Sequence, residues 1–199
     1  MARHQVTRTR LDPGTRREQI LVAASAVLST RSAGELTFES VAEAAGVSRA
    51  LVYNYFGDRN GLLAAVELRA LEELNRSLHA SIDTGLAPAE QIAPLARAYL
   101  SFADAHGPLW NHLAAGGVHH PSVEAARRIR IERLAELWGG TEVAHDAATA
   151  VTVVLESATI GGSVPGTDAS PGAGAVATVC RILTSGLEAG LAEHPTPLR

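Results

Sequence analysis

The chain of 199 residues contains no lysine and a single cysteine, Cys180. One thiol cannot form an intrachain disulfide, and it cannot supply a zinc site built from cysteines. Aromatic residues make up only 4% of the sequence, and no apolar run is long enough to span a bilayer. The N-terminal residues are polar and basic, unlike a secretory signal peptide. We therefore expect a cytoplasmic protein without a membrane partner.

Because lysine is absent, all 17 basic residues are arginines, and the formal net charge is −4. The charge is unevenly distributed. Residues 1–60 carry eight arginines and six acidic residues, whereas the remainder carries nine arginines and 15 acidic residues. A basic head on an acidic body is compatible with DNA binding at one end of the molecule, although the asymmetry alone is a weak signal.

The apolar pattern predicts an all-α fold, because strand-like alternation is missing and hydrophobic residues, 46% of the chain, recur with helical spacing. Thr15 and Glu18 have the spacing of a capping box at the start of the first helix. We divide the chain into residues 1–60, an arm with a small DNA-binding domain, and residues 61–199, a helical body. About nine helices are expected, over roughly 15–30, 37–45, 48–56, 58–81, 88–105, 109–115, 121–138, 142–160 and 171–192.

Two of the expected helices are short and meet across a tight turn. Thr37 has the position of an N-cap, and Gly46 ends that helix because glycine adopts a left-handed cap without strain. Ser48 caps the next helix immediately, Gly57 breaks it, and Asp58 caps the following one. This arrangement predicts a helix-turn-helix on local chemistry alone.

The same segment carries a longer pattern. It reads Thr37-Phe38-x-x-Val41-Ala42-x-x-Ala45-Gly46-Val47-Ser48, followed by Leu51-Val52-Tyr53-x-Tyr55-Phe56-x-x-Arg59-x-x-Leu62-Leu63. This pattern resembles the DNA-binding domain of the TetR family of bacterial transcriptional regulators. The resemblance implies a three-helix reading head and a helical ligand-binding and dimerising body. We expect no cofactor.

The candidate DNA-binding residues lie at the front of the third helix and around it. Arg49 has the side chain to pair with guanine, and Asn54 can pair with a base edge. The resemblance implies phosphate contacts for Tyr53, Tyr55 and Arg59. The full set is Thr37, Ser48, Arg49, Ala50, Tyr53, Asn54, Tyr55 and Arg59, with Arg8 and Arg10 of an N-terminal arm.

The body is expected to hold a small-molecule site and a dimer interface. A largely apolar pocket with a few polar anchors suits a small hydrophobic or amphipathic effector. The ligand candidates are Tyr99, Phe102, Trp110, His112, Arg128 and Trp138. The resemblance implies that the last two long helices pair with those of a second copy. The interface candidates are Ala147, Val151, Val154, Leu155, Ala158, Val179, Leu183 and Leu187.

The resulting hypothesis is a repressor that binds a palindromic operator as a homodimer and is released by a small effector. An activator and a non-sensing architectural DNA-binding protein of the same fold remain alternatives. An enzyme is disfavoured because no nucleophile–base constellation or phosphate-binding loop is visible. A metal site is also disfavoured, since His106, His112, His119 and His120 lack the spacing of a tetrahedral ligand set.

Overall fold

The computed structural model describes residues 12–30, 35–114, 117, 120–159, 177–178, 180–187 and 189. Within these residues the fold is all-α and contains no strand, as the sequence predicts. Residues 177–178, 180–187 and 189, near the C-terminus, are also helical. The named helices are α1 (Pro13–Thr30), α2 (Phe38–Ala45), α3 (Arg49–Phe56), α4 (Arg59–Ser81), α5 (Pro88–Ala114), α6 (Pro121–Leu137) and α7 (Glu142–Thr159).

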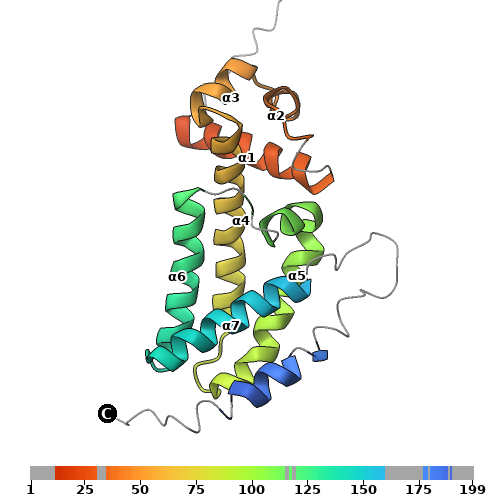
Figure 1. The fold of residues 1–199 in the computed structure, drawn as a ribbon. Coiled ribbons are helices and arrows are strands. Elements are labelled where there is room, and N and C mark those ends of the chain that lie inside the picture. Colours follow the sequence, from red (N-terminus) through yellow and green to blue (C-terminus); the bar gives the residue numbers. More distant parts are fainter. Residues whose placement is uncertain are drawn as a thin grey trace, which may run out of the picture.

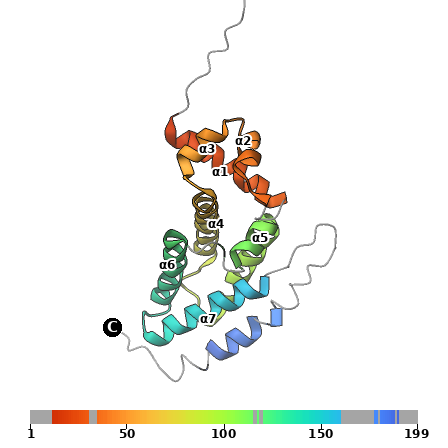
Figure 2. The same cartoon turned by 45° about the horizontal axis from the view of Figure 1, so that its top comes forward.

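Helix α4 connects the two ends of the molecule. Figure 1 shows α1, α2 and α3 gathered at one end, with α4 running from them into the body between α5 and α6. Helix α7 crosses the far end, and the helical residues 180–187 lie beside it in both views (Figure 2). None of the helices in the described ranges has the length and apolar character required to cross a membrane.

The predicted caps of the small domain are confirmed. The Thr37 hydroxyl accepts a hydrogen bond from the Ser40 amide, and the Ser48 hydroxyl accepts one from the Leu51 amide. Gly46 closes α2 in the left-handed conformation, with φ of 64°. Asp58 accepts a hydrogen bond from the Gly61 amide at 2.7 Å and begins α4. Short side chains therefore set the helix boundaries here, independently of distant contacts.

The start of α1 differs from the prediction. The helix begins at Pro13, and its cap is Asp12, not Thr15. The Asp12 carboxylate accepts a hydrogen bond from the Thr15 amide at 3.0 Å. A carboxylate one residue before a proline is a favourable cap, because proline needs no partner for its nitrogen. The predicted capping partner Glu18 instead forms an ion pair with Arg69 of α4, with 2.8 Å between Oε1 and Nε.

Two predicted helices are joined in the structure. Residues 88–105 and 109–115 were expected as separate elements, but α5 extends from Pro88 to Ala114. The break survives as a kink at Gly107, whose φ of 39° and ψ of −108° are not helical. The expected nine helices are therefore observed as α1–α7 plus the C-terminal helical residues of the described part.

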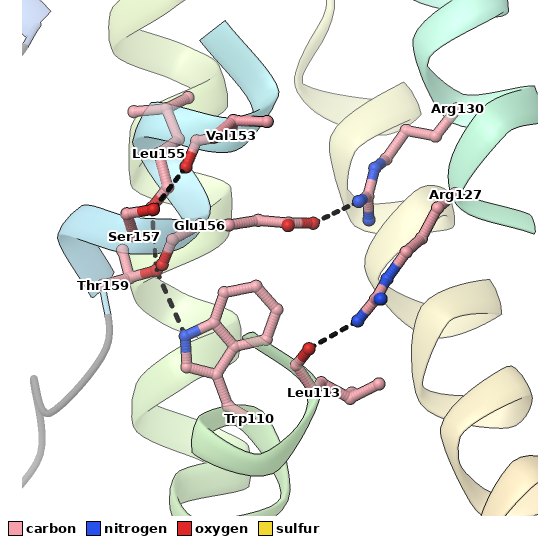
Figure 3. A network of polar contacts seen from close by, with 9 residues as sticks. All are labelled: Trp110, Leu113, Arg127, Arg130, Val153, Leu155, Glu156, Ser157 and Thr159. Atoms are coloured by element: carbon pink, nitrogen blue, oxygen red, sulfur yellow. Dashed lines mark hydrogen bonds and ion pairs between the residues drawn. The ribbon is translucent and has the colours of Figure 1, made fainter. Parts of the chain in front are cut away.

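The core is continuous from the small domain into the body. Both tryptophans are buried in it, and each indole N–H has an internal acceptor. Trp110 donates to the Thr159 hydroxyl at 3.1 Å, and Trp138 donates to the Gln91 side-chain oxygen at 3.2 Å. Figure 3 shows the indole of Trp110 pointing towards Thr159 on α7. These bonds connect α5 to α7 and the end of α6 to the start of α5.

We expect Thr159→Val to destabilise the protein by about 1–3 kcal/mol, because it leaves the buried Trp110 N–H without an acceptor while preserving the side-chain shape. Urea denaturation followed by tryptophan fluorescence measures the loss. Ser157→Ala is the control, since the Ser157 hydroxyl is exposed and bonds only locally to the Val153 carbonyl. An equal effect of the two substitutions would contradict the assigned role of the Trp110–Thr159 bond.

Candidate nucleic-acid interface and internal cavity

Helix α3 buries one face and exposes the other. Val52 and Phe56 are buried against the small-domain core. Arg49, Ala50, Tyr53 and Asn54 are all exposed, and Tyr53 is the most conspicuous because 59% of this aromatic residue is accessible. The four side chains come from the first turn and a half of the helix. The exposed face therefore combines a cation, a small residue, a phenol and an amide, which is chemistry suited to DNA.

Neighbouring residues hold this face in position. The ring of Phe38, at the start of α2, contacts the Tyr53 ring edge-on with 6.2 Å between centroids. The Arg49 guanidinium pairs with the Glu39 carboxylate at 2.7 Å, and both side chains remain well exposed. Arg49 is thus oriented by an acidic neighbour that DNA phosphates would compete with.

The remaining predicted DNA-binding residues surround α3. Thr37 and Ser48 are exposed at the N-termini of α2 and α3, where both also act as caps. Arg59 is exposed at the start of α4, and its Nε donates to the Leu36 carbonyl at 3.1 Å. Tyr55 is half-buried and packs against the core. Arg8 and Arg10 lie outside the described residues.

The junction between α3 and α4 depends on a residue that sequence reasoning did not single out. A Cβ atom on Gly61 would lie 2.2 Å from the backbone oxygen of Phe56. No contact of that length is tolerated, so α3 and α4 can approach this closely only with glycine at position 61. The sequence signal was available, since Gly61 occupies the first turn of a helix that otherwise favours larger residues.

The small domain is the part of the chain that comparison with known proteins recognises. Residues 20–66 match the family described as bacterial regulatory proteins, tetR family. The match covers less than half of the chain, so the likeness to that family is established for this segment. The match spans α2 and α3 completely, together with parts of α1 and α4.

Two kinds of relative resemble this chain, one in the sequence of the small domain and one in the overall fold. The HTH-type transcriptional regulator BetI of Brucella suis biovar 1 is 38% identical over 80 residues, which is 40% of this chain and 40% of that protein. The chain thus aligns with well under half the length of this curated relative. A tetR-family regulator from Streptomyces coelicolor has a TM-score of 0.68 at 22% identity, covering 92% of this chain and 82% of that one.

A third relative was solved with a ligand. A TetR variant from Acinetobacter baumannii AYE in complex with minocycline superposes with a TM-score of 0.67 at 18% identity, covering 90% of this chain and 98% of that one. At this identity, the superposition shows a shared fold and nothing about a ligand of this chain.

The body contains a cavity between α4, α5, α6 and α7. Its volume, measured as the space open to the centre of a water molecule, is about 60 Å³. Polar groups from each of these helices line it, namely Asn75, His79, Tyr99, Arg130, Arg133 and Thr152. The rest of the wall is aliphatic and comprises Leu78, Ile82, Leu95, Leu134, Leu137, Val151 and Leu155.

Of the six predicted ligand residues, Tyr99 lines this cavity. Phe102 and Trp110 are buried nearby in mutual ring contact, and Trp138 is buried with its N–H bonded to Gln91. His112 contacts the fully buried Glu67 carboxylate at 2.9 Å. Arg128 is exposed and faces Glu132 along α6. These five side chains therefore serve packing, pairing or the surface in this structure.

The cavity arginine that sequence reasoning missed is Arg130, which is only 7% exposed. The signal was present in the helical period, because Val123, Arg130 and Leu134 recur on one face of α6. That face places Arg130 among buried residues and Arg128 outside them. The low apolar content around position 130 made the inward orientation of Arg130 hard to predict.

The histidines that raised a metal hypothesis have other neighbours. His106 contacts Glu73 at 3.3 Å and stacks on Phe102, while His120 accepts the Ser122 amide hydrogen at the start of α6. His119 lies outside the described residues. Within the described ranges, no three metal-binding side chains come together.

The predicted interface residues divide between the inside and the margin of the protomer. Val151, Leu155 and Leu187 are buried in its core, and Ala147, Val154, Ala158 and Leu183 are half-buried. Val179 has no described placement. The exposed residues of these segments form two outward stripes. They comprise Ala150, Val153 and Ser157 on α7, with Thr178, Ile182, Gly186 and Ala189 near the C-terminus.

Proposed function

We propose that this protein is a DNA-binding transcriptional regulator of the TetR family, specifically a repressor that binds a palindromic operator as a homodimer and is released by a small molecule. Residues 1–60 form its reading head and residues 61–199 its sensing and dimerising body, with α4 shared between them. The observation that carries the proposal is the exposed face of α3, formed by Arg49, Ala50, Tyr53 and Asn54.

The physical argument begins with the shape of α3. A short helix with a free polar face fits the major groove, where its N-terminal residues reach base edges. Arg49 has the fork geometry for guanine, and Asn54 has the amide for a base edge. Thr37, Ser48 and Arg59 flank the helix with donors for phosphates. One eight-residue helix gives little affinity, so two copies related by a twofold axis are expected on one face of the DNA.

Fluorescence anisotropy tests the proposal directly. The full chain is titrated onto DNA from upstream of its own gene, and onto scrambled DNA, across a salt series. Selective binding with a steep salt dependence supports a sequence-specific regulator. If the two DNAs bind equally, selection from a random-sequence library decides. Failure to enrich any sequence would overturn the reading-head assignment.

We expect Glu39→Gln to tighten DNA binding by about threefold to tenfold, because it removes the carboxylate that holds Arg49 and repels phosphates. The same anisotropy titration at low and high salt measures the change. Glu43→Gln is the matched control, since Glu43 is also exposed on α2 and no contact with Arg49 is seen. Weaker binding of Glu39→Gln would instead make Glu39 a necessary positioning residue for Arg49.

The proposed dimer uses the outward stripes of α7 and the C-terminal helical residues. Val153 is 53% exposed and Ile182 is 66% exposed, and such large apolar side chains on one face favour burial against a partner. The buried Val151 and Leu155 would support this face from behind. Sedimentation velocity of the wild type and of a Val153→Asp, Ile182→Asp variant tests the assignment.

Helix α4 provides a route from the cavity to the reading head. Its first turn carries Arg59, bonded to Leu36, and its second half contributes Asn75 and Leu78 to the cavity. The Glu18–Arg69 pair also ties α4 to α1. A molecule that favours one position of α4 would therefore shift the separation of the two heads and the affinity for DNA.

A second candidate function, a non-sensing architectural protein, predicts a closed and inert body. The cavity and its unpartnered polar atoms favour a sensor instead. The choice between repressor and activator depends on the position of the operator relative to the promoter.

A further inference from the structure

We propose that the body cavity binds an amphipathic carboxylate, whose charged group lies on Arg130 and Tyr99 and whose alkyl chain runs along the aliphatic wall to the mouth. This inference rests on the proposed sensing function of the body and adds the chemical class of the effector.

The first observation is a set of buried hydrogen-bonding atoms that lack partners. Arg130 is 7% exposed and uses Nη2 to bond the Glu156 carboxylate, whereas its Nε and Nη1 have no partner. Figure 3 shows Glu156 reaching from α7 to the end of this guanidinium. Buried donors without acceptors are costly, so an acceptor from outside the chain is the expected solution.

Tyr99 and Asn75 add polar groups to the same wall. The Tyr99 hydroxyl is buried with the Thr152 side chain as its polar neighbour, and the Arg130 guanidinium lies over its ring at 5.8 Å. Burial raises the pKa of Tyr99 to about 12, so the phenol stays protonated and able to donate. The Asn75 side-chain oxygen is unpartnered, and rotation of the amide would present its NH₂ group instead.

The charge around the cavity selects the sign of the ligand. Arg130 and Arg133 both line the cavity. None of the described residues that line the cavity is acidic, and Glu156 pairs with Arg130. The surplus is positive, which favours an anion and disfavours an ammonium group. Both parallel donor pairs of a guanidinium include Nη2, which Glu156 occupies, so the ligand carboxylate would accept a charge-assisted hydrogen bond from Nη1 or from Nε.

The apolar wall defines the remainder of the ligand. Val151 and Leu155 line the cavity and are buried, as are Tyr99 and Arg130. Ile82 is half-buried and Leu137 is 41% exposed, so the aliphatic wall continues from the interior to solvent. About 60 Å³ exceeds the roughly 10–15 Å³ that admits one water molecule. A carboxylate with its first carbons fits there, and the chain extends towards Leu137.

Isothermal titration calorimetry on the full chain tests the class of ligand with three probes of equal length: octanoate, 1-octanol and octylamine. Octanoate is expected to bind at least about tenfold more tightly than 1-octanol, because only the carboxylate satisfies the guanidinium donors with a charge. Octylamine is expected to bind most weakly. Equal binding of octanoate and 1-octanol, preference for octylamine, or no heat with octanoate would each overturn the proposal.

Four variants locate the site. The double variant Arg130→Gln, Glu156→Gln removes both charges together and is expected to abolish the preference for octanoate. Glu156→Gln alone is expected to tighten octanoate binding, since Arg130 loses its internal anion. Tyr99→Phe is expected to weaken octanoate by about fivefold. Arg128→Gln is the control, because Arg128 is exposed on the same helix and faces Glu132.

Folding and function are separated by two further measurements on the same proteins. Circular dichroism melting checks that each variant is folded, and Tyr99→Phe and Glu156→Gln keep the test valid if the double variant is not. Operator binding is measured without probe. DNA binding without octanoate binding overturns this inference and leaves the reading head intact. Octanoate binding without DNA binding supports the inference and overturns the proposed regulator.

Discussion

Replacing Arg49 by alanine is expected to weaken binding to the operator by about 10- to 100-fold, because a bidentate pair with a guanine contributes about 1–3 kcal/mol of discrimination. Binding to scrambled DNA should fall much less, since a non-specific complex retains its phosphate contacts. The measurement is anisotropy on both DNAs at matched salt. Because Arg49 is exposed, the substitution is expected to leave folding intact.

Two substitutions bracket this result. Arg59→Ala should weaken both DNAs in parallel and reduce the salt slope by about one, as expected for a phosphate contact. Arg76→Ala, an exposed arginine far along α4, should change neither affinity. If Arg49→Ala behaves like Arg59→Ala, then Arg49 contacts phosphate and another residue of α3 reads the sequence.

Gly61→Ala is expected to destabilise the protein by about 2–4 kcal/mol, which is the range for overpacking against atoms that cannot move aside. On helix propensity alone, alanine would stabilise this position by about 1 kcal/mol. The sign reverses because the new methyl group would meet the Phe56 carbonyl, a backbone atom. Thermal denaturation followed by circular dichroism measures the change.

Asn60→Ala provides the comparison for Gly61→Ala, since Asn60 is exposed one residue earlier in the same helical turn. It should alter stability by less than about 0.5 kcal/mol. If Gly61→Ala melts at or above the wild-type temperature, the close approach of α3 and α4 is not required. If it folds but fails to bind DNA, the junction positions the recognition helix.

Much of the small domain followed from local chemistry. Thr37, Gly46, Ser48 and Asp58 set the helix boundaries through hydrogen bonds to residues three or four positions away, and such bonds are readable from spacing. The predicted start of α1 at Thr15 was wrong because Thr15 and Asp12 both offer a capping oxygen. In the structure the Asp12 carboxylate, beside Pro13, caps the helix. When two possible capping residues lie within one turn, their spacing alone does not decide which of them begins the helix.

The cavity was less accessible to sequence reasoning. The sequence predicts aromatic ligand contacts. In the structure, however, Trp110 and Trp138 donate their N–H groups to Thr159 and Gln91, residues 49 and 47 positions away. Those partners are chosen by helix packing, which one-dimensional spacing does not encode. The same holds for Val151 and Leu155, whose inward orientation is decided by the contact of α7 with α5 and α6.

The sequence by itself determined the all-α class, the helix-turn-helix with its caps, and the polar composition of α3, because each depends on residues within one or two turns. Tertiary structure alone decided that Arg130 faces inward with two unpartnered donors, whereas Arg128 faces solvent. The two arginines are chemically identical and two residues apart. Only the packing of α6 against its neighbours distinguishes them, since burial is a property of the assembled helices.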